Sequence, residues 1–131
     1  MEQKEIMWKK LEQLYESLES GMSREKYFRM CEQMGKEPNP ERTPPDWEEF
    51  PQSVLNAVNI FNQLGDRVYP EIGYIGKDYT NLPILMQFYD VSDKEFLLEL
   101  IHWLDQRAIK KSSEDLKREY DKLKRKSNGP K

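Results

Sequence analysis

Apolar residues recur at helical spacing along most of this 131-residue chain, and that periodicity restricts it to a largely helical fold. In the first stretch, Met7, Leu11, Leu14 and Leu18 follow one another at intervals of four, three and four residues. Such spacing places them on one face of an amphipathic helix, which we expect from Glu2 to Glu19. Further helices are predicted over residues 23–34, 51–64 and 82–89 and from residue 92 onward.

The signals that start and stop these helices are mostly glycine, serine and proline. Gly21, Gly35 and Gly65 each follow a periodic stretch, at the place where a C-terminal cap favours glycine. Ser23 is the expected N-cap of the second helix, and its short connection to the first predicts an antiparallel helical hairpin. Ser92, with Glu95 three residues later, has the spacing of a capping box.

Two stretches interrupt the helical pattern. Residues 36–50 contain four prolines, which lack backbone donors, so we expect an extended connector with one helical turn that docks Trp47 and Phe50 on the core. Residues 66–81 are rich in tyrosine and isoleucine but are broken by Pro70 and two glycines. This second stretch is either a short hairpin or an ordered loop.

These patterns predict an all-α fold. We expect a single compact domain over residues 1–126, made of five or six helices in helical hairpins, with the connector at 36–50 and one irregular aromatic-rich loop at 66–81. A sixth helix could begin at residues 112–115, or these residues could lie inside a longer fifth helix. Residues 127–131 are expected to form a frayed basic tail.

Composition limits the compartment and the chemistry. No stretch approaches the ~20 apolar residues that cross a bilayer, no secretory leader is recognisable, and Cys31 is the only cysteine, so a cytoplasmic protein is expected. His102 is the only histidine, which leaves no set of four Cys/His ligands for zinc and no obvious catalytic triad. We therefore expect no enzyme activity, no metal and no cofactor.

Aromatic residues in the two interrupted stretches are the candidate partner-binding residues. They are Trp47, Phe50, Tyr69, Tyr74 and Tyr79. The tyrosines either seal the open end of the helical bundle or form an exposed contact patch, since tyrosine and tryptophan are favoured at protein interfaces.

The charge is distributed unevenly. Residues 1–106 carry 11 Lys/Arg and 20 Asp/Glu, a net charge of −9, whereas residues 107–131 carry 10 Lys/Arg and 4 Asp/Glu, a net charge of +6. A thin apolar stripe of Leu116, Tyr120 and Leu123 runs through the basic end, and it could pack on the first helix. Alternatively this end could bind nucleic acid phosphates. The residues that would do so are Lys117, Arg118, Lys122, Lys124, Arg125 and Lys126.

Part of the sequence resembles small proteins of tailed bacteriophages. The resemblance lies in Met30-Cys31-Glu32, the proline-rich connector, Gly65-Asp66-Arg67-Val68-Tyr69, Tyr74-Ile75-Gly76-Lys77-Asp78-Tyr79-Thr80 and Leu104-Asp105 followed by the basic end, within residues 25–126. It implies a phage-encoded accessory or virion-assembly protein in the host cytoplasm. The leading hypothesis is a non-enzymatic interaction factor that binds another protein, or a second copy of itself as a homodimer, with nucleic acid as the alternative partner.

Overall fold

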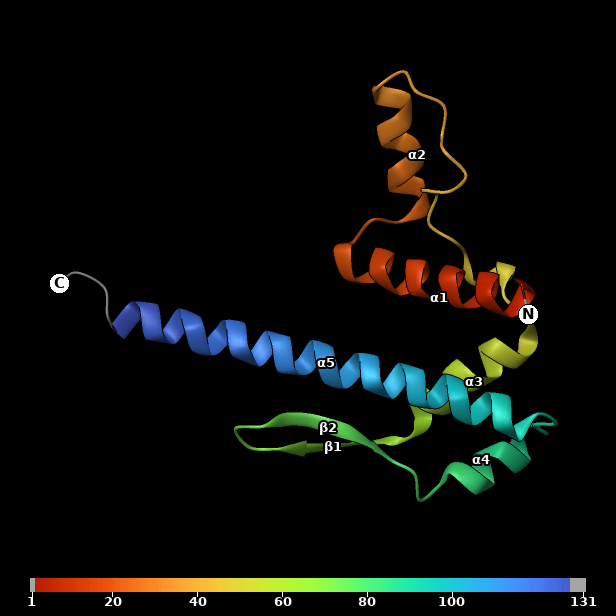
Figure 1. Ribbon diagram of the computed structural model, residues 1–131, viewed down its shortest axis with the longest axis vertical. Helices are drawn as coiled ribbons and strands as arrows, with labels where there is room; N and C mark the ends of the chain where they lie inside the picture. The colour runs from red at the N-terminus through yellow and green to blue at the C-terminus, as the bar shows by residue number, and fades with distance from the viewer. Residues whose placement is uncertain (1, 128–131) are drawn as a thin grey trace. The chain divides into compact units, whose positions relative to one another are not determined.

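The computed structural model describes residues 2–127, and the chain divides into two compact units, residues 1–51 and residues 52–131. The first unit contains α1 (Glu2–Ser20), α2 (Arg24–Gln33) and a 3-10 turn, η1 (Trp47–Glu49) (Figure 1). The single domain expected over residues 1–126 stays a prediction. The tail expected at residues 127–131 lies outside the described residues except for Ser127, which belongs to the last helix.

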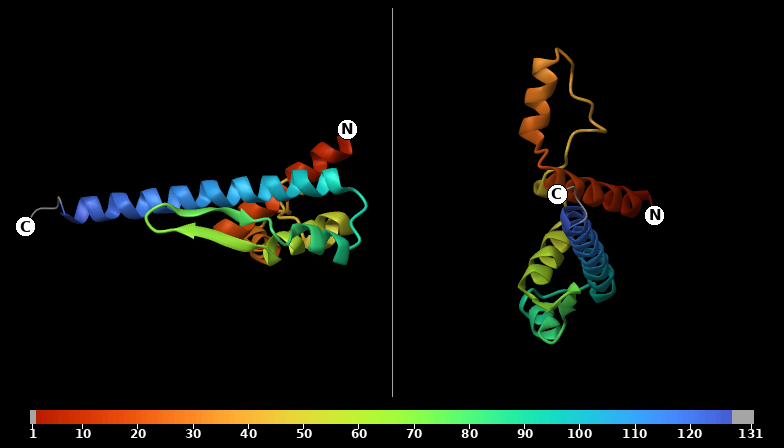
Figure 2. Two further views of the ribbon diagram at one scale, coloured as in Figure 1. Left: turned by 90° about the horizontal axis from the view of Figure 1, so that it is seen from below. Right: turned by 90° about the vertical axis from the view of Figure 1, so that its left-hand side faces the viewer.

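The helices of the first unit begin and end close to where their apolar stripes and caps predict. Leu11 and Leu14 of α1 are buried, and the Oγ of Ser23 accepts a hydrogen bond from the Lys26 N–H at 3.1 Å, which confirms Ser23 as an N-cap. The prediction of an antiparallel hairpin is wrong, because α2 points away from α1 instead of running back along it (Figures 1 and 2). The buried face of α2 meets the connector instead, since the hydroxyl of Tyr27 accepts a bond from the Asn39 N–H at 3.0 Å.

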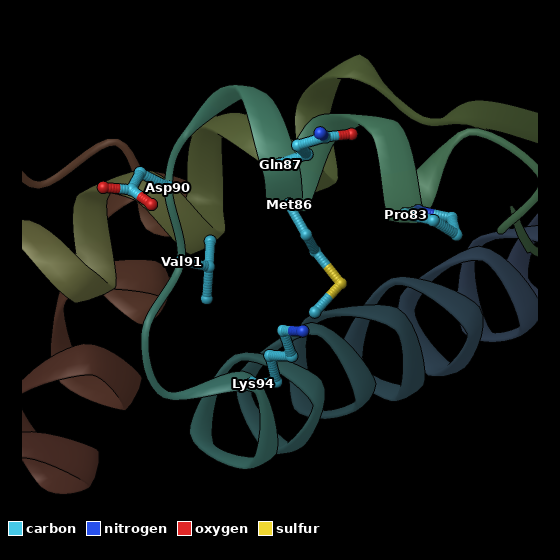
Figure 3. A pocket seen from close by; sticks show the side chains of 6 residues that line it. All are labelled: Pro83, Met86, Gln87, Asp90, Val91 and Lys94. Atoms are coloured by element: carbon cyan, nitrogen blue, oxygen red, sulfur yellow. The ribbon is translucent and has the colours of Figure 1, made fainter.

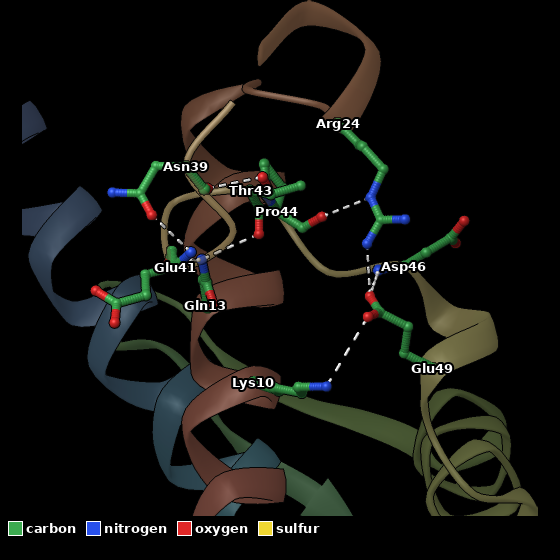
Figure 4. A network of polar contacts seen from close by, with 9 residues as sticks. All are labelled: Lys10, Gln13, Arg24, Asn39, Glu41, Thr43, Pro44, Asp46 and Glu49. Atoms are coloured by element: carbon green, nitrogen blue, oxygen red, sulfur yellow. Dashed lines mark hydrogen bonds and ion pairs between the residues drawn. The ribbon is translucent and has the colours of Figure 1, made fainter. Parts of the chain in front are cut away.

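A polar network ties the proline-rich connector to α1 and α2 (Figure 4). Arg24 donates to the Pro44 carbonyl at 3.0 Å and to Glu49 Oε2 at 2.7 Å, and that same oxygen accepts the Asp46 N–H at 2.7 Å. Gln13 of α1 donates to two connector carbonyls. The connector is therefore an ordered part of the first unit, although it holds only one helical turn.

That turn places its two aromatic rings as the sequence predicts. Trp47 packs edge-on against Tyr15 of α1, with ring centroids 6.0 Å apart, and it also lies 6.1 Å from the ring of Phe50. Phe50 is buried and Trp47 is half-buried. The expectation of one helical turn that docks both rings is confirmed.

The second unit contains α3 (Gln52–Gln63), β1 (Gly65–Tyr69), β2 (Gly73–Asp78), α4 (Leu82–Phe88) and α5 (Lys94–Ser127). Both α3 and β2 pack on α5, and α4 packs on α3 (Figures 1 and 2). The apolar stripes of α3 and the first half of α5 form the core. Its buried residues include Val54, Ala57, Val58, Ile60, Phe61, Leu64, Leu97, Leu100, Ile101 and Leu104.

The all-α prediction is wrong because residues 65–78 form an antiparallel β-hairpin. The strands pair from Gly65 opposite Asp78 to Tyr69 opposite Gly73, with a register shift between Arg67 and Val68. Gly73 has a φ of +85°, a conformation that residues with a side chain rarely adopt. Of the two alternatives for residues 66–81, the short hairpin is confirmed and the irregular loop is wrong. The described residues contain five α-helices and one two-stranded sheet.

The last helix, α5, is a single element of 34 residues, so no sixth helix starts at residues 112–115. Its N-cap is Asp93, whose Oδ1 accepts the Phe96 N–H at 3.0 Å, and the capping box predicted at Ser92 is therefore wrong. Within residues 2–127, no helix is both long and apolar enough to cross a membrane.

Candidate functional site

The carboxylate of Asp105 is the centre of the contact between the hairpin and α5. Asp105 is only 4% exposed, although it is an acidic residue in the middle of a helix. Its Oδ1 accepts the Tyr74 hydroxyl at 2.5 Å, its Oδ2 accepts the Tyr79 hydroxyl, and both oxygens lie 3.2 Å from the Lys77 N–H. Three donors from β2 and the residue after it thus converge on one buried charge.

These contacts shift the acidity of all three side chains. Burial by itself would raise the pKa of Asp105, but the hydrogen bonds from Tyr74, Tyr79 and the Lys77 N–H outweigh it and lower the pKa. Burial and the hydrogen bond to Asp105 raise the pKa of Tyr74 and of Tyr79 far above the usual value of a phenol. At neutral pH the carboxylate is therefore charged and both phenols are protonated, which is the state in which all these bonds form.

Lys77 forms a second anchor beside this one. Its ammonium group donates to the Leu64 carbonyl at 3.2 Å and to Asp66 Oδ1 at 2.6 Å, and it lies 4.7 Å from the centroid of the Phe61 ring. The residue is 8% exposed. Lys77 therefore fastens β2 to the end of α3, while Asp105 fastens it to α5.

Close backbone approach completes the attachment of the hairpin. A Cβ at Gly73 would lie 2.6 Å from Leu116 Cδ1, and a Cβ at Gly76 would lie 3.3 Å from Asp105 Oδ2. Ser112 Oγ accepts the Tyr74 N–H at 3.3 Å. Glycine at these two positions lets the strand lie directly on the helix, so this cluster is a structural clamp whose polar groups are occupied by one another.

The candidate partner-binding residues consequently separate into three groups. Tyr74 and Tyr79 meet at Asp105 and hold the hairpin, whereas Tyr69 is 56% exposed at the end of β1. Trp47 and Phe50 belong to the other unit and pack within it. The sequence interpretation therefore combined residues with different roles, and it missed Asp105 and Lys77 altogether.

An apolar surface remains at the turn of the hairpin and along the second half of α5. We call it the tip-and-stripe surface; it consists of Tyr69, Ile72, Leu116, Tyr120 and Leu123, which are 56%, 64%, 36%, 68% and 65% exposed. Tyr69 pairs with Gly73, and Gly73 lies against Leu116, so the hairpin part and the helix part adjoin. Beyond this junction α5 continues past the hairpin (Figures 1 and 2).

The basic residues proposed for nucleic acid binding do not share one face of α5. At 3.6 residues per turn, Lys117 and Lys124 lie on one flank of the apolar stripe, whereas Arg118 and Arg125 lie on the side of the helix opposite the stripe. Arg118 is also paired with Asp115 at 2.8 Å. Arg118, Lys122 and Arg125 follow one another at steps of four and three residues, so they form a basic strip on the side opposite the apolar stripe, with Asp115 and Asp121 beside it.

A hollow of about 480 Å³ lies between α4 and the start of α5 (Figure 3). Met86 and Val91 supply its apolar wall, and Asp90 and Lys94 its charged groups. Neither histidine nor cysteine lines it, and His102 is exposed on α5. In the described part of the chain, no group of three or more His, Cys, Asp or Glu side chains is placed to hold a metal ion.

Comparison of the chain with models of protein families, with curated proteins and with solved structures finds no significant match.

Proposed function

We propose that this protein is a non-enzymatic interaction factor that binds another protein through the tip-and-stripe surface. The observation that carries the proposal is the contiguous exposure of Tyr69, Ile72, Leu116, Tyr120 and Leu123 next to a fixed hairpin. Large apolar side chains that lie together at the surface are typical of protein contact sites. Tyrosine is among the residue types that contribute most to binding when a partner removes them from water.

The clamp at Asp105 supports this assignment in an indirect way. A catalytic carboxylate needs access to a substrate, whereas the Asp105 oxygens are taken up by Tyr74, Tyr79 and the Lys77 N–H. The same clamp keeps the turn of the hairpin against α5, because it fixes β2 along the helix and Gly73 lies against Leu116. A rigid scaffold that presents a small apolar surface is suited to binding a partner.

Nucleic acid binding through the basic residues of α5 is the second proposal. It is ranked lower because phosphates bound to the basic strip would leave the apolar stripe in water, and because Arg118 of that strip is already paired with Asp115. The resemblance to tailed-phage proteins implies a role in phage assembly or as an accessory factor, and we keep that role as part of the proposal.

Site-specific photocrosslinking in extract of the source cells tests the proposed surface. A photoreactive phenylalanine analogue replaces Tyr120 in one variant and Ile72 in a second, and Arg118, on the opposite side of α5, serves as the matched control. We expect discrete protein adducts from the first two positions and none from the third. Equal labelling at all three positions, or none at any, would contradict the proposed surface.

A further inference from the structure

The apolar stripe of α5 has the spacing of a helix-packing seam. Ile109, Leu116 and Leu123 follow one another at intervals of seven residues, and Tyr120 lies four residues after Leu116. All lie on one continuous helix, in which alternating steps of four and three residues keep a single face toward a partner helix. Residues 109–127 of this helix are about 28 Å long at 1.5 Å per residue.

A second series with the same period runs beside the first. Lys110, Lys117 and Lys124 each follow one of the three apolar residues, and all three are exposed. Because a step of one residue turns an α-helix by about 100°, the three lysines form one flank of the seam. Flanking positions of this kind select a partner helix by its charge.

We propose that the occupant of this seam is an acidic amphipathic α-helix of another protein, an inference that rests on the proposed function. Its apolar residues pack on Leu116, Tyr120 and Leu123, and its Asp or Glu side chains face Lys117 and Lys124. Ile72 and Tyr69 of the hairpin contact the end of the partner helix that lies nearest Leu116. These contacts lengthen a seam that would be short for a helix pair alone.

The net charge of this part of α5 favours an acidic helix over a second copy of the chain as the occupant of the seam. Residues 107–127 carry 9 Lys/Arg and 4 Asp/Glu, a net charge of +5. Two copies paired along this segment would place +5 against +5, and like charges across a contact disfavour the pairing. An acidic helix instead gains from the same charges, both in attraction during approach and in pairing along the flank.

Two synthetic peptides test the charge of the partner directly. Both have the same leucine and isoleucine seam over four heptads, with Glu at the flanking positions of one and Lys at those of the other. Each is labelled and titrated with the full chain in about 0.15 M salt, and binding is followed by fluorescence anisotropy. We expect the acidic peptide to bind at least about tenfold more tightly than the basic one.

Substitutions in the chain identify the seam and the flank. The double variant Leu116→Ala/Leu123→Ala should weaken binding of the acidic peptide by about tenfold or more, because two buried anchors are truncated. Lys117→Glu/Lys124→Glu should reverse the preference in favour of the basic peptide. The matched control, Arg118→Glu/Arg125→Glu, makes the same charge change one residue further round the helix and should change the affinity by less than about threefold. Circular dichroism checks that each variant keeps its helix content.

Each contrary result has a distinct meaning. Equal binding of both peptides, or a preference that does not reverse in Lys117→Glu/Lys124→Glu, overturns the acidic-helix inference, and the proposed function stands if Tyr120 still crosslinks to a protein. Sedimentation equilibrium that shows a dimer lost in Leu116→Ala/Leu123→Ala makes a second copy the occupant and also overturns it. If Leu116→Ala/Leu123→Ala still binds duplex DNA, the lysines contact phosphates and not an acidic helix. That result overturns the inference as well. Loss of both the peptide preference and the crosslinks removes the inference and the proposed function together.

Discussion

Replacing Asp105 with asparagine should destabilise the protein more than the loss of any exposed charge. The two side chains have the same shape, but asparagine has no charge and offers one acceptor oxygen where aspartate offers two. Hydrogen bonds to a charged group contribute about 1.5–3 kcal/mol each, against about 0.5–1.5 kcal/mol for neutral pairs. Asp105 accepts two phenol hydroxyls, and one of them would face an amide donor in the variant.

From these contacts we expect Asp105→Asn to cost about 2–4 kcal/mol of unfolding free energy. At ~4 °C per kcal/mol for a chain of this size, the melting temperature should fall by about 8–16 °C. The matched control is Asp115→Asn on the same helix, since the Asp115 side chain is 55% exposed and its partner in the ion pair, Arg118, is 69% exposed. That control should cost less than about 1 kcal/mol. Thermal and urea unfolding, followed by circular dichroism at pH 7, give both values.

The pH dependence of the unfolding free energy is an independent check on the hydrogen bonds to Asp105. The pKa of Asp105 is lowered in the folded state, so its contribution is present above the unfolded pKa of about 3.9 and disappears as the pH falls through the folded pKa. The pKa values of Tyr74 and Tyr79 are raised, so their contribution is present below the unfolded pKa of about 10 and declines above it. The stability gap between wild type and Asp105→Asn should therefore be widest from about pH 5 to 9. A gap below ~1 kcal/mol at pH 7, or one equal to that of Asp115→Asn, would refute the clamp.

Three further substitutions test the fold at single points. Gly73→Ala should cost about 1–3 kcal/mol by urea unfolding, because its Cβ would lie 2.6 Å from Leu116 Cδ1 at a φ of +85°, and adding Leu116→Ala should recover part of that loss. Lys77→Met keeps the apolar part of the side chain but loses its bonds to Leu64 and Asp66, so a loss of about 1–3 kcal/mol is expected in the same assay. Asp93→Ala should cost about 1 kcal/mol and Ser92→Ala almost nothing, and equal effects would contradict the observed cap.

The helices could be predicted from the sequence because local patterns specify them. The apolar stripe of α1 and the Ser23 cap of α2 each act within a few residues, so the physical consequence of each can be derived separately. The cap of α5 was misplaced because Ser92 and Asp93 are both good N-cap residues, and only the structure shows which oxygen meets a backbone N–H.

The hairpin was harder to predict because its turn lacks the usual signals. Glu71 occupies the left-handed region with a φ of +71°, where Gly or Asn would be expected, and the pairing shifts register between Arg67 and Val68, which breaks the alternation of a strand. The sequence also suggested that a helix could start near Ser112, because serine is a common N-cap residue. The Ser112 hydroxyl accepts the Tyr74 N–H from 38 positions earlier in the chain, so it is a tertiary contact within a continuous helix.

Asp105 could have been found from its position in the helical pattern. It lies four residues after Ile101 and directly after Leu104, both of which are apolar and buried. An acidic residue within an apolar stripe must find donors when it is buried, and the tyrosines near residues 66–81 were the available supply. The donors cannot be assigned from sequence alone, because Tyr74 and Tyr79 are 31 and 26 residues away.

The clamp at Asp105 holds the hairpin part of the tip-and-stripe surface against the helix part. The substitution Asp105→Asn can therefore show whether the two parts bind a partner independently. Asp105 holds β2 on α5 and so keeps the hairpin turn that carries Ile72 on the helix, where Gly73 lies against Leu116, whereas Tyr120 and Leu123 depend only on the continuity of the helix. At a temperature where Asp105→Asn is still folded, crosslinking from Ile72 should therefore fall several-fold while crosslinking from Tyr120 persists. Unchanged crosslinking from Ile72 would mean that the partner contacts the hairpin wherever it lies. Equal loss at both positions would mean that the helix requires the clamp, and the two parts of the surface would then form one cooperative unit.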